Sequence, residues 1–138
     1  MSTYRETGPV STLVAALSGN VFGLDPSTGR VLWEHELDMA GNPTALVVTE
    51  SFIYAATFKT LACLRYPTGK LVWSVDTREV GRATLMLDGE RLIVAKRGVI
   101  ECFSLAGETV WHNGFKGKGQ GAIALGYPGI VVQADDRG

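Results

Sequence analysis

Two cysteines are the side chains in this sequence best suited to nucleophilic, redox or soft-metal chemistry. Cys63 and Cys102 lie 39 residues apart, so they form neither a CxxC motif nor a vicinal pair. Two cysteines also do not amount to a disulfide framework. We therefore expect two buried, reduced thiols and no zinc or dithiol site.

The two histidines are the next candidates for metal or acid–base chemistry. His35 lies two residues after Trp33, whereas His112 directly follows Trp111. If the two segments are equivalent β-strands, the alternation of side chains sends the imidazoles to opposite faces. No shared metal site is predicted, and we expect both histidines to be solvated or hydrogen-bonded.

Two segments toward the C-terminus carry charges that could bind an ion. Asp135, Asp136 and Arg137 lack the Asp-x-Asp-x-Asp-Gly pattern of a calcium loop, so we expect a solvated chain end. The stretch 114–121 is rich in glycine and lysine, but β-strand residues follow it where a phosphate loop requires a helix. It is predicted to be a flexible connection at a face where a partner could contact it.

The composition excludes several classes of protein. The 138 residues are 46% hydrophobic and 20% charged, which fits one packed soluble domain. A net charge of −1 gives no field that would attract nucleic acid or an anionic membrane. The polar stretch 1–9 lacks the apolar segment of a secretory signal, and no apolar run approaches the about 20 residues that span a bilayer. These features predict a cytoplasmic protein.

A repeat of about 40 residues organises the chain. The three tryptophans follow one another at spacings of 40 and 38 residues, and a glycine precedes each of them by four residues. A fixed period in this range is typical of repeat architectures and propellers. The pairs are Gly29 and Trp33, Gly69 and Trp73, and Gly107 and Trp111.

Each repeat is predicted to contain four short strands. The segments between the tryptophans are rich in Val, Ile, Thr and aromatic residues and show no helical periodicity. Proline and glycine at 25–29 and 66–69 predict a tight turn between the third and fourth strands, and Gly107 provides a turn one residue shorter. The predicted strands are 44–50, 51–57, 60–66 and 70–76, then 83–88, 91–96, 99–104 and 108–113.

The segment VFGLDPSTGRVLW (21–33) resembles the repeat of pyrroloquinoline-quinone-type β-propellers. In that family an aspartate and a Thr-Gly turn precede a tryptophan that docks between neighbouring blades. The resemblance extends from about Leu13 onward and weakens along the chain, because Arg65 and Ser104 replace the aspartate. It implies an all-β propeller with three four-stranded blade repeats, in which the three tryptophans and the three glycines pack blade against blade.

For the quinone-dependent enzymes of this group, the resemblance implies a full ring in one chain, a vicinal disulfide against the quinone and acidic side chains that hold calcium. Cys63 and Cys102 occupy the same position in neighbouring repeats, so they cannot form that disulfide. We therefore expect no cofactor, no metal and no catalytic residues.

Both ends of the repeat array, which spans 11–138 after a polar arm at 1–10, are incomplete. Its first unit starts at 11–17, which matches the second strand of the later units. The segments 121–127 and 130–135 match a first and a second strand without a third or fourth. Strand 121–127 could supply the missing first strand of a neighbouring chain, and strand 130–135 would then be redundant with 11–17.

Because propellers have about 4 to 8 blades, three repeats predict an oligomer. A head-to-tail homodimer would have about six blades. The alternatives are another homo-oligomer, a ring with a different protein, or a monomer that is self-closed or is an open half-ring pairing with a strand of another protein. The predicted interface residues are Leu13, Val14, Ala15, Ile123, Ala124, Leu125, Ile130, Val131 and Val132.

The predicted function is a non-enzymatic scaffold that binds or assembles a protein or peptide partner on the faces and central channel of an oligomeric propeller. A small-ligand or enzymatic site built at the subunit interface is the alternative from another class.

Overall fold

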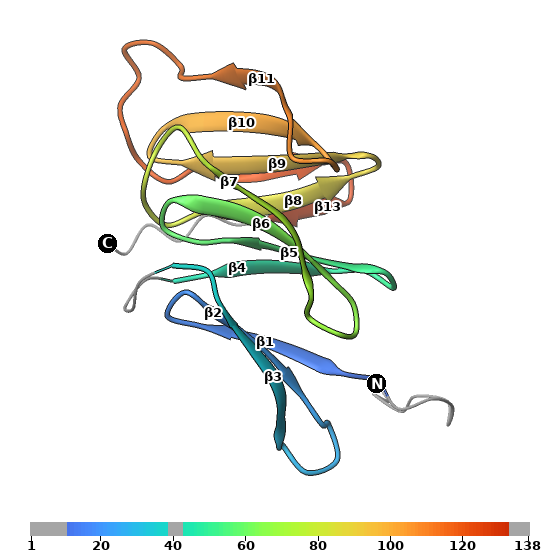
Figure 1. Cartoon of the computed structure of the whole chain (residues 1–138). Helices are drawn as coiled ribbons and strands as arrows, with labels where there is room; N and C mark the ends of the chain where they lie inside the picture. Colours follow the sequence, from blue (N-terminus) through green and yellow to red (C-terminus); the bar gives the residue numbers. More distant parts are fainter. Residues whose placement is uncertain (1–10, 39–42, 133–138) are drawn as a thin grey trace.

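The computed structural model describes residues 11–38 and 43–132, and within them the chain forms thirteen antiparallel β-strands and no helix. Figure 1 shows the three larger sheets stacked one after another in chain order. We call these sheets blades 1, 2 and 3 from the N-terminus. The described segments therefore also contain no helix able to cross a membrane. The all-β propeller architecture that the sequence predicts is confirmed.

Blade 1 has three strands in the described part of the chain, ordered β1-β2-β3. They are β1 (Leu13–Leu17), β2 (Asn20–Leu24) and β3 (Val31–Glu36). Within the described ranges no strand pairs with the free edge of β1. The predicted arm at 1–10 lies outside the described residues.

Blades 2 and 3 each have four strands in sequential antiparallel order. Blade 2 consists of β4 (Ala45–Val48), β5 (Phe52–Ala56), β6 (Thr60–Arg65) and β7 (Leu71–Asp76). Blade 3 consists of β8 (Thr84–Asp88), β9 (Arg91–Lys96), β10 (Val99–Ser104) and β11 (Thr109–Asn113). The first strand of blade 2, β4, contacts both β1 and β8, so consecutive blades meet along their inner strands.

The C-terminal pair is shorter than the sequence predicts. It consists of β12 (Leu125–Tyr127) and β13 (Ile130–Val132), and β13 lies beside β8 (Figure 1). The predicted strand 121–127 is wrong in its first half, because the Ile123 carbonyl accepts a hydrogen bond from Thr84 Oγ1 at 2.8 Å instead of pairing in a ladder. Ile123 and Ala124 thus precede the strand. The end of the predicted strand 130–135 and the acidic group at 135–137 lie outside the described residues.

A β-bulge recurs at the same place in all three blades. The register between the third and fourth strands shifts after the pairs Gly23–Trp33, Cys63–Trp73 and Cys102–Trp111. The extra residues in the fourth strands are Leu32, Val72 and Val110. A bulge increases the local twist and re-aims the neighbouring side chain, so it sets the direction of each tryptophan.

The tight turns before these tryptophans have the predicted backbone. Gly29, Gly69 and Gly107 have φ values of +77°, +77° and +87°, a region that glycine enters without steric cost. In blade 1 the Asp25 carboxylate accepts a hydrogen bond from Ser27 N at 2.8 Å. In blade 3 the Ser104 hydroxyl takes its place and accepts from Ala106 N at 3.2 Å, so the shorter turn keeps the same kind of side-chain support.

The hydrophobic core lies between the blades. One cluster joins blade 1 to blade 2, a second joins blade 2 to blade 3, and a third joins blade 3 to the β12–β13 pair. Stability therefore depends on face-to-face contact between sheets. Representative members are Val21 and Leu64 in the first cluster, Leu61 and Phe103 in the second, and Cys102 and Leu125 in the third.

Phe103→Ala should lower the free energy of unfolding by about 3 to 5 kcal/mol, because it leaves a cavity in the core between blades 2 and 3. Phe103 is 1% exposed, whereas Val110, at the bulge of the same blade, is 44% exposed. Val110→Ala is the control and should cost less than about 1 kcal/mol. Urea unfolding measures both variants, and equal losses would contradict a core located between the blades.

Candidate functional site: blade joints and open faces

Two tryptophans join consecutive blades through the same pair of contacts. The Trp33 ring lies against Gly69 of the next blade, and its Nε1 donates to the Pro67 carbonyl at 2.7 Å. Trp73 lies against Gly107 in the same way, and its Nε1 donates to the Leu105 carbonyl at 2.9 Å. A Cβ on Gly69 would collide with the indole. We call this unit a blade joint. In it, a tryptophan ring packs on a turn glycine of the next blade, and its indole N–H donates to the carbonyl two residues before that glycine.

The third tryptophan and the first turn glycine are the unused halves of such joints. Trp111 is 45% exposed. Gly29 has the same φ as Gly69, but a Cβ placed on it would meet no heavy atom within 4 Å. The chain therefore has two complete joints within its described residues, one exposed tryptophan at one end and one empty glycine turn at the other.

The first blade has a sheet face whose equivalent in the next blade is buried. We call the face of a blade that contacts the preceding blade its leading face, and the opposite face its trailing face. The leading face of blade 2 includes Ile53, Ala55, Ala62 and Leu64, all 0% exposed. One repeat earlier these positions are Leu13, Ala15, Phe22 and Leu24, and Leu13 is 54% exposed. The leading face of blade 1 is thus apolar, with Leu13 exposed and the other three residues half-buried.

The trailing face of blade 3 is partly covered. Leu125 and Val132 from β12 and β13 pack against a cluster that contains Ile93 and Cys102. Ile130 and Val131 stay exposed. Of the predicted interface residues, Leu125 and Val132 therefore contact their own blade 3, and Val14 packs toward blade 2.

A buried lysine crosses the junction between blades 2 and 3. Lys96 is almost fully buried, and its Nζ donates to Thr77 Oγ1 at 2.7 Å and to the Phe58 carbonyl at 3.2 Å. Burial lowers the pKa of Lys96 to about 8, and the nearby carboxylates of Glu101, Asp38 and Asp76 raise it in part. The amine thus connects blade 3 to two loops of blade 2.

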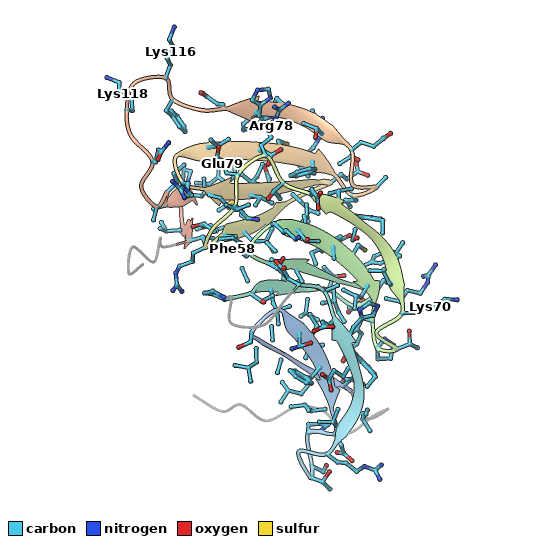
Figure 2. The ribbon with its side chains drawn as sticks, turned by 60° about the vertical axis from the view of Figure 1, so that its left-hand side comes forward. Phe58, Lys70, Arg78, Glu79, Lys116 and Lys118 are labelled. Atoms are coloured by element: carbon cyan, nitrogen blue, oxygen red, sulfur yellow. The ribbon has the colours of Figure 1, made fainter. Side chains whose placement is uncertain are left out.

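A buried glutamate works beside this lysine. Glu101 accepts a hydrogen bond from Arg78 N at 2.7 Å and lies 3.7 Å from Arg78 Nε. Figure 2 shows Arg78 and Glu79 on the segment that leaves β7 and passes over blade 3. Because this segment carries Thr77 as well, Lys96 and Glu101 together fix the connection between the blades. Sequence reasoning missed both residues, although a charge inside the apolar strands 91–96 and 99–104 was a usable signal.

Blades 1 and 2 are linked by different polar groups. The Asp38 carboxylate accepts hydrogen bonds from Thr57 Oγ1 at 2.9 Å and Lys59 N at 3.2 Å. The Tyr66 hydroxyl accepts from Thr12 N at 2.9 Å and donates to the Thr12 carbonyl at 2.8 Å. These bonds hold the start of β1 against blade 2.

The connection after β11 borders a shallow hollow at one end of the sheets. Gly98, Phe115, Lys118, Ala122 and Ile123 line it, together with two glycines of the connection. Lys116 and Lys118 project outward from this connection (Figure 2). Phe115 and the neighbouring turn residue Arg97 both have φ near +46°, which is unusual for residues with a side chain. The hollow combines apolar walls with a cation at its edge.

The cysteines and histidines, the most reactive side chains in the sequence, do not come together in one site in the described part of the chain. Both cysteines are free and buried, as predicted, and burial raises the pKa of the Cys63 thiol to about 11, which makes it a poor nucleophile. His112 is exposed on β11, and the His35 ring lies near the Glu36 carbonyl. Over residues 11–38 and 43–132, no group of three or more His, Cys, Asp or Glu side chains could hold a metal ion.

Repeated four-stranded blades and tryptophan joints define a β-propeller of the pyrroloquinoline-quinone-like repeat class. Residues 17–124 match the family model described as outer membrane protein assembly factor BamB. Since this match covers well over half of the chain, the chain belongs to that family. No curated protein sequence matches it significantly.

Solved structures share the fold at low identity. The computationally designed protein Ika4 has a TM-score of 0.70 at 18% identity over 91% of this chain and 81% of its own. The designed Ika8 has a TM-score of 0.65 at 16% identity over 89% of this chain. BamB from Moraxella catarrhalis has a TM-score of 0.56 at 23% identity over 85% of this chain. The chain spans 42% of Ika8 and 36% of that BamB.

Gly69→Ala should destabilise the chain by roughly 2 kcal/mol more than Gly89→Ala, because its Cβ displaces the Trp33 ring and breaks the bond to Pro67. Both glycines have positive φ, +77° and +57°, so both substitutions carry a similar backbone cost. Gly89 has open space around its Cβ position and is the matched control. Chemical unfolding followed by tryptophan fluorescence measures the difference, and equal effects would contradict the joint.

Lys96 should make the stability of the fold rise between pH 8 and pH 10.5. Its pKa is about 8 in the folded chain and about 10.5 when unfolded, so the unfolded state binds more protons in this range. The unfolding free energy of the wild type relative to Lys96→Met should increase by on the order of 3 kcal/mol across this window. A pH series of urea unfolding curves on both proteins tests this, and a difference independent of pH would contradict it.

Proposed function

We propose that this chain is a non-enzymatic protein-binding module that serves in the assembly of other proteins. Its membership of a family described as an assembly factor supports this role. The apolar leading face of blade 1 and the exposed residues Ile130 and Val131 also support it, since contiguous exposed apolar surface is typical of interaction sites.

The hollow beside the connection after β11 is the observation that carries the proposal. Phe115 and Ile123 offer apolar contact, while Lys118 places a positive charge at the edge. Such a site suits a partner segment with an apolar side chain next to an acidic one. The positive φ angles of Arg97 and Phe115 fit this role, because unfavourable backbone conformations cluster where proteins bind ligands.

The oligomeric state and location are parts of the same proposal. Within the described residues, the unpaired edge of β1 and the exposed apolar residues at both ends of the blade array support a homodimer. A cytoplasmic location is a further part of this proposal. The family description names an outer-membrane assembly factor, so cell fractionation would decide between the two locations.

Site-specific cross-linking tests the proposed binding surface. The photo-reactive residue p-benzoylphenylalanine at position 115 should give a discrete adduct with a second protein in living cells. The same residue at position 90, in the exposed β8–β9 turn, is the control and should give none. Lys118→Glu should reduce the adduct at least about tenfold if the partner segment is acidic.

Adducts of equal yield from both positions, or an adduct unaffected by Lys118→Glu, would contradict the proposed surface. An adduct that contains only this chain would indicate a contact between copies and would also overturn it. A parallel measurement of solution mass shows whether Lys118→Glu leaves the assembly state unchanged, which is the expected result.

A further inference from the structure

We infer that the exposed Trp111 of one copy docks on the Gly29 turn of a second copy, and so forms the third blade joint between chains. This inference rests on the oligomeric propeller of the proposed function but does not depend on the hollow beside Phe115. The occupant of both open ends is therefore another copy of this chain, joined head to tail.

The two halves of this joint have the geometry of the two joints already formed. The Gly29 turn has the same φ as the Gly69 turn, and Gly29 N donates to the Asp25 carbonyl at 2.7 Å, as Gly69 N donates to the Arg65 carbonyl at 2.8 Å. The Gly29 turn thus shares the glycine φ and the closing hydrogen bond of the occupied Gly69 turn, while the space beside Gly29 is empty.

The acceptor for the third indole is also present. In the two formed joints the indole N–H bonds to the carbonyl two residues before the turn glycine, at Pro67 and Leu105. The equivalent carbonyl in the Gly29 turn belongs to Ser27, in an exposed turn. Trp111 of the second copy would therefore donate to the Ser27 carbonyl.

The sheet faces that would meet are complementary in the same way. The leading face of blade 1 carries Phe22 and Leu24 where blade 2 carries the fully buried Ala62 and Leu64. Docking on the trailing face of blade 3 would place these side chains over Cys102, the strand partner of Trp111. Because the two surfaces differ, the contact is heterologous, and two copies close a ring by forming it twice.

The blade formed between two copies, which we call the composite blade, has room for one second strand. Because β1 and β13 both match a second strand, only one of them can occupy that position. β1 is held by five residue pairs with β2 and by the two Tyr66–Thr12 hydrogen bonds, and Val14 packs against blade 2. β13 has three pairs with β12. We therefore assign the second-strand position to β1, where Leu13 replaces Val132, and the first-strand position to β12 of the other copy.

Complementation between two variants tests the joint. Trp111→Ala and Gly29→Asn each remove one half, and asparagine tolerates positive φ, so the monomer should still fold. Each variant alone should raise the dimer dissociation constant at least about 30-fold. A 1:1 mixture should recover dimer, because the heterodimer keeps one intact Trp111–Gly29 joint. Gly89→Asn, the same change at an open turn outside the joint, should dimerise like the wild type.

Sedimentation velocity across a concentration series, with thermal unfolding as the folding control, reads out these masses. A wild-type chain that stays monomeric at high micromolar concentration, single variants that keep the wild-type mass, or a mixture no more dimeric than its components would each overturn the inference. Cross-linking from position 115 distinguishes this failure from that of the proposed function. If an adduct with a different protein persists in Trp111→Ala, the proposed binding surface beside Phe115 holds, and the sedimentation result alone decides whether the joint between copies forms.

Discussion

The contact of a tryptophan with a turn glycine in the next blade is the interaction on which the rest of the structure depends. A single antiparallel sheet has two faces to bury, and the core here lies between sheets. The indole supplies apolar area and a hydrogen-bond donor at the outer edge of each sheet pair, at the Pro67 and Leu105 carbonyls. Only a turn without a side chain allows the ring to approach so closely.

The same contact is the one that we propose to form between copies of the chain. Because each joint needs parts from two successive blades, an open array of blades ends with one unused half of each kind. Trp111 and Gly29 are these halves in the described chain. Buried polar groups, Lys96 and Glu101 at one junction and Asp38 at the other, add bonds that hold each blade to the next. We therefore propose that the surfaces that stabilise the interior also serve as interaction surfaces at the ends.

The sequence predicted the parts of this structure that repeat. The fixed spacing of Gly29 and Trp33 recurs twice, so the blades and their turns followed from the pattern. The bulge at Leu32 could not be predicted, because it changes pairing without changing spacing. The start of β12 was placed too early, since Thr84 removes the Ile123 carbonyl from the ladder through a contact far away in sequence. The hollow beside Phe115 likewise depends on how the loop after β11 folds.

Hydrogen exchange of the three indole N–H groups is the most direct test of the central claim that these joints hold the blades together. Three indole resonances in a ¹⁵N-labelled sample, assigned with single Trp→Phe variants, would be followed at a low concentration. We expect strong protection for Trp33 and Trp73, whose N–H groups donate to the carbonyls of Pro67 and Leu105, and fast exchange for Trp111. Equally fast exchange at all three would contradict it.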